Sequence, residues 1–497
     1  MNLAERFVQS ATSNAEKDAV FWGDESYNYD HFNVESAAIA QDLATSYGIK
    51  SGDRVALWLK NCPEFVSAVY GVLRAGGVVV PINNFLNPSE VGYIIGDAEV
   101  DIVITDDELA EKLTELKESH SSLKIIKTST FSDLRSKAKN QAEPALPDRS
   151  PSDLAVIIYT SGTTGKPKGA MLSHGNLLHN VESCQHELEA VDLDRMAILL
   201  PMFHSFMLTV GVFLPILVGG SIVLIRSLHP PKNIIMEIIK HQATILPAIP
   251  QLFRTLATTE LPPLPLRLCI SGAAPLPVEV LKQFTERVGI PLIEGYGLSE
   301  ASPVVSLNPI RDTRKPGSIG KPVKNVEVSI QDEAGKILHN QDIGELCVRG
   351  GNVMMGYWKR PEETATTLVD GWLRTGDIGY QDDDGYFFIT DRKKDMLLVN
   401  GINVYPREIE EILYQCKGIK EAAVVGKTHP KRGEQPIAFI SLDEGAEVTT
   451  DSIKAFLKGR LADFKSPREI HICDLLPRNA TGKILKTELR ERLKQQA

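Results

Sequence analysis

The segment from Tyr159 to Gly169 constrains the fold and chemistry of this chain more than any other. It reads Tyr-Thr-Ser-Gly-Thr-Thr-Gly-Lys-Pro-Lys-Gly and follows an apolar run, Leu154 to Tyr159, that predicts a buried strand. The loop should therefore leave the carboxyl edge of a sheet, where α/β folds place ligands. Glycines let backbone N–H groups approach an anion, and hydroxyl and ammonium groups add donors, so the segment predicts a polyphosphate site.

The spacing of this segment differs from the P-loop pattern G-x-x-x-x-G-K-[ST]. Only two residues separate Gly162 from Gly165, and Pro167 follows Lys166. A flexible surface loop is the other interpretation of such a glycine- and threonine-rich stretch. The choice between the two depends on partner motifs elsewhere in the chain.

The composition is that of a globular protein, with 43% hydrophobic and 24% charged residues. A length of 497 residues predicts two or more domains, because single cores seldom grow so large. The net charge of -10 argues against a nucleic-acid binder but allows a local basic pocket for a nucleotide. Six cysteines without a C-x-x-C pair, and an N-terminus without an apolar signal core, predict a reduced, cytoplasmic protein.

Phe206 to Ile225 is a stretch of twenty residues without a charge, long enough to span a bilayer. Three glycines and a proline interrupt it. The pattern therefore predicts a buried helix, a Gly-Gly turn and a strand over Ser221 to Ile225, rather than a transmembrane helix. Peripheral contact with a membrane stays open.

Apolar periodicity predicts a β-α-β rhythm, and hence a parallel sheet, from the start of the chain. The expected helices and strands alternate over residues 31–47, 54–59, 63–75, 78–82, 100–105 and 124–128, and another helix covers residues 173–184. Several strands are expected to end in small or polar residues, at Thr160, His204, Ser271 and Glu294. Because the carboxyl ends of parallel strands lie along one edge, these residues should line one crevice.

Two of these strand ends carry further signals. The small residues Gly272, Ala273 and Ala274, together with Tyr296, would suit a flat adenine ring lying against the backbone. Close packing of a helix on a strand is an equal alternative.

A lone histidine beside apolar residues, such as His204, is more often structural than functional.

Beyond Arg311, short strands and tight turns predict antiparallel β structure, appended to the α/β core as a small barrel-like unit. Asp377 follows a glycine there, and its carboxylate would accept hydrogen bonds from a ribose diol or from a turn. The charged run Asp391 to Asp395 indicates a solvated loop or an interdomain hinge. From Met396 onward, strands and helices alternate over a small α+β domain that carries Lys483 after a glycine turn.

Taken together, these segments resemble the adenylate-forming superfamily of acyl- and aryl-CoA synthetases, peptide-synthetase adenylation domains and beetle luciferases. The resemblance covers nearly the whole chain, and bacterial fatty-acid–CoA ligases are the most similar group. It rests on five motifs in the family's order, which are Ser161 to Gly169, Tyr296 to Glu300, Thr375 to Asp377, Asp391-Arg392 with Gly401 and Pro406, and Gly482-Lys483. Ser299 stands where many relatives have threonine, a change that keeps the hydroxyl.

The resemblance implies an α/β fold with a large N-terminal domain of stacked α/β sheets that includes the small β-barrel-like subdomain. A hinge at Lys394 would join it to a small, mobile α+β C-terminal domain, so that the expected domains are 1–393 and 394–497. The implied enzyme uses ATP and Mg²⁺ to activate a carboxylic acid as acyl-AMP, releases pyrophosphate and transfers the acyl group to the thiol of coenzyme A. A non-catalytic acyl- or nucleotide-binding relative is the alternative, and a homodimer stays open.

The resemblance also assigns residues to each part of the nucleotide. The triphosphate would be held by Thr160, Ser161, Gly162, Thr163, Thr164 and Lys168, and Mg²⁺ by Glu300 and Thr164. Adenine would lie against Gly272, Ala273, Ala274, Glu294, Gly295 and Tyr296. Ser299 would lie near the phosphate, and the ribose hydroxyls would be held by Asp377 and Arg392.

Three further residues would act on the acid and the thiol. His204 would lie beside the substrate carboxylate, and Lys483 would bridge that carboxylate and the α-phosphate during adenylation. Rotation about the hinge would then remove Lys483 and bring the Gly401 loop to a tunnel for the pantetheine arm.

The expected acid pocket contains no charged residue. Its members are Phe206, Met207, Leu208, Val212, Leu276, Val304 and Val305. Because each buried methylene contributes about 0.8 kcal/mol at best, such a pocket would accept a range of medium- to long-chain fatty acids. An aryl or hydroxycinnamoyl acid is the alternative substrate, and a carrier-protein thiol is the alternative acceptor.

Overall fold

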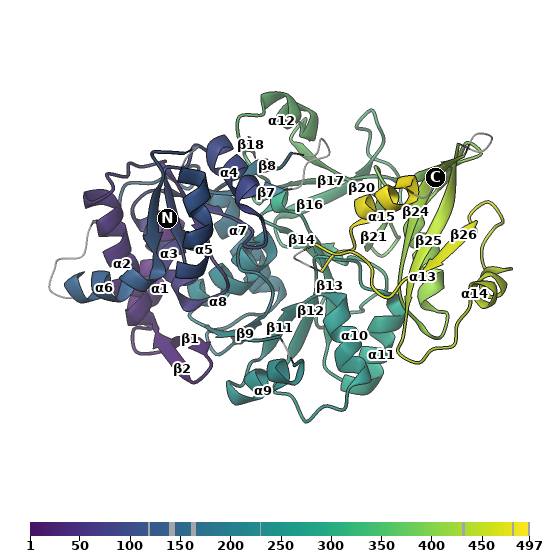
Figure 1. The fold of residues 1–497 in the computed structure, drawn as a ribbon, viewed down its shortest axis with the longest axis horizontal. Helices are drawn as coiled ribbons and strands as arrows, with labels where there is room; N and C mark the ends of the chain where they lie inside the picture. Colours follow the sequence, from purple (N-terminus) through teal and green to yellow (C-terminus); the bar gives the residue numbers. More distant parts are fainter. Residues whose placement is uncertain are drawn as a thin grey trace.

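The computed structural model describes residues 1–117, 120–138, 145–160, 166–228, 230–429, 433–479 and 482–495. Their strands form two large sheets, a smaller antiparallel sheet and a separate C-terminal sheet. Figure 1 shows the N-terminal elements at one end of the long axis and the C-terminal elements at the other. The strands that end near residues 160, 271 and 297 lie between these ends.

The seven-stranded sheet carries the glycine-rich segment. Its order is β18 (Gly356–Tyr357), β8 (Lys168–Ser173), β7 (Leu154–Thr160), β4 (Val78–Pro81), β3 (Arg54–Trp58), β5 (Ile102–Thr105) and β6 (Lys124–Lys127). Strands β7, β4, β3, β5 and β6 pair in parallel, whereas β7 and β8 pair antiparallel, with Thr160 opposite Lys168. The segment is therefore the connection of a β-hairpin.

Within the described residues of this half of the chain there are six α-helices. They are α1 (Leu3–Ser13), α2 (Tyr29–Thr45), α3 (Pro63–Arg74), α4 (Pro88–Asp97), α5 (Asp107–Lys112) and α6 (Phe131–Ala138). Of these, α2 and α3 correspond to the expected helices 31–47 and 63–75. Helix α3 is buried at every residue except Glu64. It begins with Pro63, whose fixed φ and missing N–H suit the first turn of a helix.

The nine-stranded sheet supplies the other strand ends. Its order is β15 (Lys321–Pro322), β14 (Val304–Leu307), β13 (Leu292–Gly297), β12 (Leu268–Ser271), β11 (Ile245–Ala248), β9 (Arg195–Ile198), β10 (Ser221–Leu224), β1 (Asp18–Trp22) and β2 (Glu25–Asn28). The six strands from β13 to β1 pair in parallel. Their carboxyl ends consequently share one edge.

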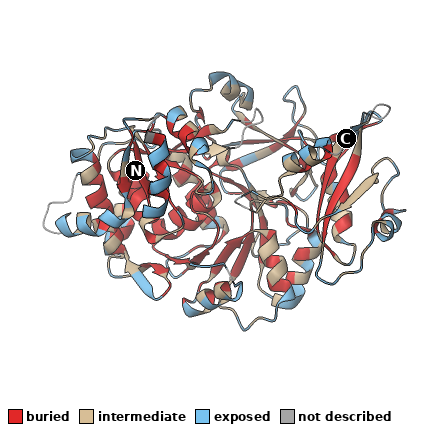
Figure 2. Ribbon diagram, viewed as in Figure 1, coloured by how far each residue is buried: buried red, intermediate tan, exposed pale blue. Residues whose placement is uncertain are grey.

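The helices of this second sheet are α7 (His174–Glu187), α8 (Leu214–Leu217), α9 (Lys232–Lys240), α10 (Pro250–Thr258) and α11 (Val278–Val288). Helix α7 begins at Ser173, whose hydroxyl accepts the N–H of Asn176 at 3.0 Å in a capping box. Side chains of both large sheets join one continuous hydrophobic core, and Figure 2 shows the buried residues gathered along their strands and intervening helices. The large N-terminal region is therefore one packed unit.

The uncharged stretch Phe206 to Ile225 forms a π-helix (Met207–Phe213), helix α8, a turn and strand β10. Within the described ranges, no helix combines the length and hydropathy that a bilayer crossing requires. The predicted order of helix, turn and strand is confirmed, and the π-helical form of its first part was not foreseen.

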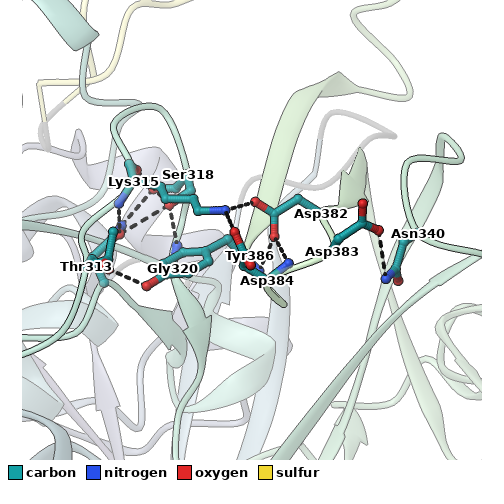
Figure 3. A network of polar contacts seen from close by, with 10 residues as sticks. Thr313, Lys315, Ser318, Gly320, Asn340, Asp382, Asp383, Asp384 and Tyr386 are labelled. Atoms are coloured by element: carbon teal, nitrogen blue, oxygen red, sulfur yellow. Dashed lines mark hydrogen bonds and ion pairs between the residues drawn. The ribbon is translucent and has the colours of Figure 1, made fainter.

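The smaller antiparallel sheet holds the predicted ribose residues. Its strands are β16 (Val326–Gln331), β17 (Gly344–Gly350), β20 (Trp372–Gln381) and β19 (Leu368–Val369), and β21 (Phe387–Arg392) pairs with β20. Helix α12 (Pro361–Thr367) directly precedes β19 in the chain. Figure 3 shows how the turn between β20 and β21 is held. The Lys315 ammonium lies between the carboxylates of Asp382 and Asp384, and the Tyr386 hydroxyl donates to the Thr313 carbonyl.

The C-terminal sheet has the order β23 (Ile402–Val404), β22 (Leu397–Val399), β25 (Gly433–Leu442) and β24 (Ile419–His429), with β26 (Glu469–Ile472) parallel to β25. Helices α13 (Pro406–Tyr414), α14 (Thr450–Leu457) and α15 (Lys486–Gln495) pack on it. Its apolar side chains form two clusters of their own, separate from the main core. The expected small α+β region is confirmed.

Two expectations about local structure were wrong. Strand β9 ends at Ile198, six residues before His204, because the apolar residues that follow leave the sheet as a loop. Strand β13 continues through Glu294 to Gly297, since it gains an antiparallel partner in β14. In the charged run, for which a solvated loop and a hinge were the alternatives, Asp391 and Asp395 are buried and the three basic residues between them are exposed.

Candidate active site

A cavity of about 990 Å³ opens where the strand ends of both large sheets meet the smaller sheet and the C-terminal region. Thirteen of the predicted site residues line it, and these are Thr160, Lys168, His204, Gly272, Ala273, Gly295, Tyr296, Ser299, Glu300, Asp377, Arg392, Lys394 and Lys483. They come from segments that span more than three hundred positions of the sequence. The fold thus brings together residues that the motifs could only suggest separately.

The glycine-rich segment enters the cavity through its two ends. Thr160 closes β7 and Lys168 opens β8, and both line the cavity. Ser161, Gly162, Thr163 and Thr164 lie outside the described residues, so their contacts with phosphate stay predictions.

The two ends of the segment are tied to helix α4, one through Asp97 and the other through Tyr93. The Tyr159 hydroxyl donates to one carboxylate oxygen of Asp97 at 2.6 Å, and Arg360 bonds the other at 2.6 Å. Tyr93, one turn earlier on α4, donates to the Pro167 carbonyl at 3.2 Å. These contacts hold the residues at which the predicted phosphate-binding segment begins and ends.

Tyr357 is a cavity residue that the motifs did not identify. Its hydroxyl donates to Oε1 of Glu300 at 2.8 Å, and the Lys168 ammonium lies 5.0 Å from its ring centre. The backbone N–H of Met354 also donates to the Glu300 carbonyl at 2.8 Å. One aromatic side chain therefore links the predicted phosphate lysine to the predicted metal carboxylate.

The carboxylate of Glu300 suits Mg²⁺ by its chemistry. Among the residues that the structure describes, no group of three or more His, Cys, Asp or Glu side chains could enclose a metal ion. Mg²⁺ commonly binds through one or two carboxylates together with substrate phosphates, so a single acidic residue beside a phosphate site fits this ion. Glu300, together with the undescribed Thr164, stays the predicted metal position.

His204 lies at the edge of the cavity in the loop after β9. Its Nδ1 accepts the backbone N–H of Phe206 at 3.3 Å, so the neutral ring carries its proton on Nε2. Burial lowers the pKa of His204 to about 4, and the ring is therefore neutral at pH 7. Next to it, the hydroxyls of Ser205 and Ser299 are 3.0 Å apart.

The predicted adenine residues divide into two groups. Gly272, Ala273, Gly295 and Tyr296 line the cavity, whereas Ala274 and Glu294 do not. A Cβ at Gly272 would lie 3.0 Å from the ring of Phe206, which explains the need for glycine there. This close contact is with a protein side chain, so the placement of adenine beside Gly272 stays a prediction.

Glu294 faces away from the cavity. Its carboxylate accepts the N–H of Leu276 at 3.0 Å and lies 3.9 Å from the guanidinium of Arg407 on α13. Burial raises the pKa of Glu294 to about 7, although Arg407 opposes the shift. The side chain thus contacts the C-terminal region, and only its strand neighbours face the nucleotide side.

The predicted ribose residues form a connected group. Asp377 and Arg392 are opposite each other on β20 and β21, and the Arg392 Nε lies 3.2 Å from Oδ1 of Asp377. The Tyr296 hydroxyl donates to the other oxygen of Asp377 at 2.5 Å. This tyrosine therefore joins the predicted adenine and ribose positions.

The predicted acid pocket is only partly correct. Phe206 and Val304 line the cavity, whereas Met207, Leu208, Val212, Leu276 and Val305 are core residues behind it. Their apolar side chains pack within the protein because the π-helix and neighbouring strands turn them inward. Other apolar residues take their place on the wall, including Ile158, Phe203, Ile270, Pro303 and Leu307.

Lys483 reaches the cavity from the C-terminal region. Burial, and after it the charge of Arg392, lower the pKa of the Lys483 ammonium to about 8. Lys394 lines the cavity at the start of that region, while Gly401 lies in an exposed turn between β22 and β23 and does not line it. The structure therefore holds the lysine, and not the Gly401 loop, at the site.

Comparison with known proteins gives matches along nearly the whole chain. Residues 7–358 match the AMP-binding enzyme family, and residues 408–483 match the AMP-binding enzyme C-terminal domain. A long-chain-fatty-acid–CoA ligase of Bacillus subtilis is 37% identical over 525 residues, with 97% of this chain and 93% of the relative covered. A feruloyl-CoA synthase of Amycolatopsis is 33% identical, with 98% of each chain covered.

A solved structure has the same arrangement. The ATP-bound form of MatB from Rhodopseudomonas palustris is 32% identical, and the comparison covers 99% of each chain with a TM-score of 0.91. The large N-terminal and small C-terminal parts expected from the resemblance are thus confirmed. On these matches, and on the order of its motifs, the chain belongs to the AMP-binding enzyme family.

Proposed function

We propose that this enzyme joins a medium- to long-chain fatty acid to coenzyme A through an acyl-AMP intermediate. The observation that carries this proposal is the composition of the cavity of about 990 Å³. Polar residues expected to hold ATP, with Lys483 among them, share it with an apolar wall, while its remaining charged lining residues, Glu345, Arg374 and Lys393, belong to the smaller sheet and the segment before the hinge. The similarity to a long-chain-fatty-acid–CoA ligase at 37% identity supports the choice of acid.

The reaction needs two steps because a carboxylate does not react with a thiol directly. In the first, a carboxylate oxygen attacks the α-phosphorus of ATP, and the bond to the β-phosphate breaks to release pyrophosphate. In the second, the thiol sulfur of coenzyme A attacks the acyl carbon, AMP leaves, and the thiol proton passes to solvent. The first step replaces oxide, a poor leaving group, with AMP, a good one, and the thiol displaces that AMP in the second step.

The chain's own residues would serve the first step by placing donors where negative charge develops. Thr160, Lys168 and the hairpin between them would hold the β- and γ-phosphates, and each such donor is typically worth about 10²- to 10³-fold in rate. Glu300 would hold Mg²⁺, which when bound neutralises charge on the triphosphate. Tyr357 would orient Glu300 through the hydrogen bond described above.

His204 and Lys483 would act on the reacting carboxylate. Because His204 is neutral, its Nε2–H could donate a hydrogen bond to the acid without cancelling the charge of the nucleophile. The Lys483 ammonium would lie between the carboxylate and the α-phosphate and reduce the repulsion between two anions. Burial lowers the pKa of Lys483 and so disfavours its charged form. Two anions bound beside the ammonium would favour the charged form and raise this pKa again.

We also propose domain boundaries at 1–393 and 394–497, with Lys394 as the hinge. The residues around it are anchored on both sides. After the hinge, Asp395 pairs with Arg490 of the C-terminal region at 2.6 Å, whereas before it Asp391 accepts the N–H of Arg407 at 2.9 Å across the proposed boundary, a bond that a rotation would break; Lys394 itself is exposed. A rotation at this position would withdraw Lys483 and leave each core intact.

An aryl or hydroxycinnamoyl acid is the second candidate substrate, and the 33% identity with a feruloyl-CoA synthase favours it. The experiment that separates the two follows AMP release with ATP, Mg²⁺ and coenzyme A over a panel of fatty and aromatic acids. We expect the highest kcat/KM with aliphatic chains. A preference for hydroxycinnamic acids would reject the fatty-acid proposal, and no acid-dependent AMP with any member would reject ligase activity.

A further inference from the structure

Hydrogen bonds join the described residues on the two sides of the short turn that carries Lys483. The Asn479 N–H donates to the Lys483 carbonyl at 2.9 Å, and the Leu485 N–H donates to the Pro477 carbonyl at 2.8 Å. The Lys483 N–H in turn donates to the side-chain oxygen of Asn479 at 2.9 Å. These bonds close the turn on itself, but they do not fix where it lies relative to the domain.

Arg478 supplies that connection. One of its terminal nitrogens donates to the carbonyl of Gly482, the residue before the lysine, and the other bonds the carboxylate of Glu421. A guanidinium suits this task because its donors lie in one rigid plane, so both partners are held in a set geometry.

Glu421 is a firm anchor for this arginine. It lies in β24, which pairs with β25 along nearly its whole length, and it is only 6% exposed. Its second oxygen accepts the Ser441 hydroxyl at 3.4 Å. The backbone beside Lys483 is thus tied through one side chain to the rigid sheet of the C-terminal region.

The opposite side of the turn meets the large N-terminal region. A Cβ at Gly482 would lie 2.5 Å from the Cδ1 atom of Ile249, the residue that precedes α10. The turn therefore fits between Ile249 and Arg478, and a small displacement of either would move the lysine relative to the cavity.

We propose that Arg478 and Glu421 are positioning residues for acyl-adenylate formation, which hold the Gly482 carbonyl so that Lys483 reaches the reacting anions. The proposal rests on the proposed role of Lys483. Neither residue lines the cavity, so they act through the lysine and not on the substrate. A misplacement of about 1 Å in a reacting group can cost roughly 100-fold in rate. Loss of the Arg478–Glu421 pair should therefore slow mainly the step that uses Lys483.

The test compares the two half-reactions in the full-length enzyme. The variant is R478M/E421Q, which removes both charges together and leaves no buried carboxylate without its partner. The matched control is K427M/E469Q, an ion pair at 2.9 Å between β24 and β26 that does not contact the turn. A second variant, R478K, keeps the pairing with Glu421 but loses the planar fork.

Adenylation is measured as acid-dependent exchange of labelled pyrophosphate into ATP, and thioester formation as acyl-CoA made from supplied acyl-adenylate. For R478M/E421Q we expect exchange to fall about 10- to 100-fold, with the second half-reaction and the control pair largely unchanged. R478K should lose less, again in exchange alone. Equal losses in both half-reactions, or no loss in exchange, would overturn the positioning role.

The variant K483A, measured beside them, separates this inference from the function on which it rests. If K483A loses exchange while R478M/E421Q keeps it, only the positioning role fails. If K483A itself keeps full exchange, the proposed role of Lys483 fails, and the inference about Arg478 fails with it.

Discussion

Replacing Tyr357 by phenylalanine removes one hydroxyl at the boundary between the predicted phosphate and metal positions. The hydroxyl donates to Oε1 of Glu300 at 2.8 Å, and the ring that would remain lies 5.0 Å from the Lys168 ammonium. Burial and the Glu300 charge raise the pKa of Tyr357 well above its usual value, so the hydroxyl stays a donor throughout the working pH range. The substitution therefore removes a single hydrogen bond and keeps the cation–π contact.

The magnitude follows from the nature of that bond. A hydrogen bond to a charged group contributes about 1.5–3 kcal/mol net, and about 1.4 kcal/mol corresponds to tenfold. Losing a residue that orients a metal carboxylate typically costs about 10- to 100-fold in metal affinity or activity. Both estimates predict that kcat/KM for the magnesium complex of ATP falls by about 10- to 100-fold in adenylation.

The assay follows acid-dependent pyrophosphate release at saturating fatty acid and excess Mg²⁺. Tyr380→Phe is the matched control, because its ring stacks on Phe388 in the smaller sheet and does not line the cavity. The KM for the acid and thioester formation from supplied acyl-adenylate should change little in Tyr357→Phe. An unchanged kcat/KM for ATP, or an equal loss in both half-reactions, would refute the orienting role of this hydroxyl.

Three further outcomes are expected. Lys394→Pro should impair thioester formation far more than adenylation, because the hinge loses φ freedom, and a loss confined to adenylation contradicts the hinge assignment. Pyrophosphate exchange at subsaturating ATP should fall as pH rises through about 8, because burial lowers the pKa of Lys483 to about 8 and the neutral amine cannot screen two anions. A rate of exchange that stays constant through that pH excludes the charged role of Lys483. The pKa of Glu294 is raised to about 7, so this carboxyl binds a proton more tightly in the folded than in the unfolded chain. The free energy of unfolding should therefore fall by about 3 kcal/mol as pH rises from about 4.5 to 7. In urea unfolding curves, Glu294→Gln should remove this dependence.

The order of elements along the chain could be predicted well from local patterns. The serine before α7 and the proline at the start of α3 are local signals, and both helices begin there. The apolar run before Thr160 likewise forms the expected strand. These signals succeed because a cap or a buried strand is decided largely by the residues within and beside it.

Contacts between distant segments could not be predicted in this way. Tyr357 bonds Glu300 across 57 positions, and nothing in the sequence around Tyr357 marks it as part of a site. The side chain of Glu294 turns toward Arg407 for a similar reason, because its neighbour in space comes from a region more than a hundred residues later. The sequence predicts a strand end at His204 because the apolar residues before it continue the pattern of β9. In the structure these residues leave the sheet after Ile198.

The assignment of Asp377, Arg392 and Lys483 to one site came from the family resemblance and not from their local patterns. An aspartate or lysine after a glycine turn is common on protein surfaces. The fold brings these three to one cavity through strand pairing and through the packing of the C-terminal region, both of which depend on the whole chain.

The most direct test of the central claim is the exchange of labelled pyrophosphate into ATP by the wild-type enzyme without coenzyme A. If this cavity joins a fatty acid to AMP before any thiol takes part, exchange should require the acid and Mg²⁺ and proceed in the absence of the thiol. Exchange that requires coenzyme A, or acid-dependent formation of ADP and phosphate in place of pyrophosphate, would contradict the account.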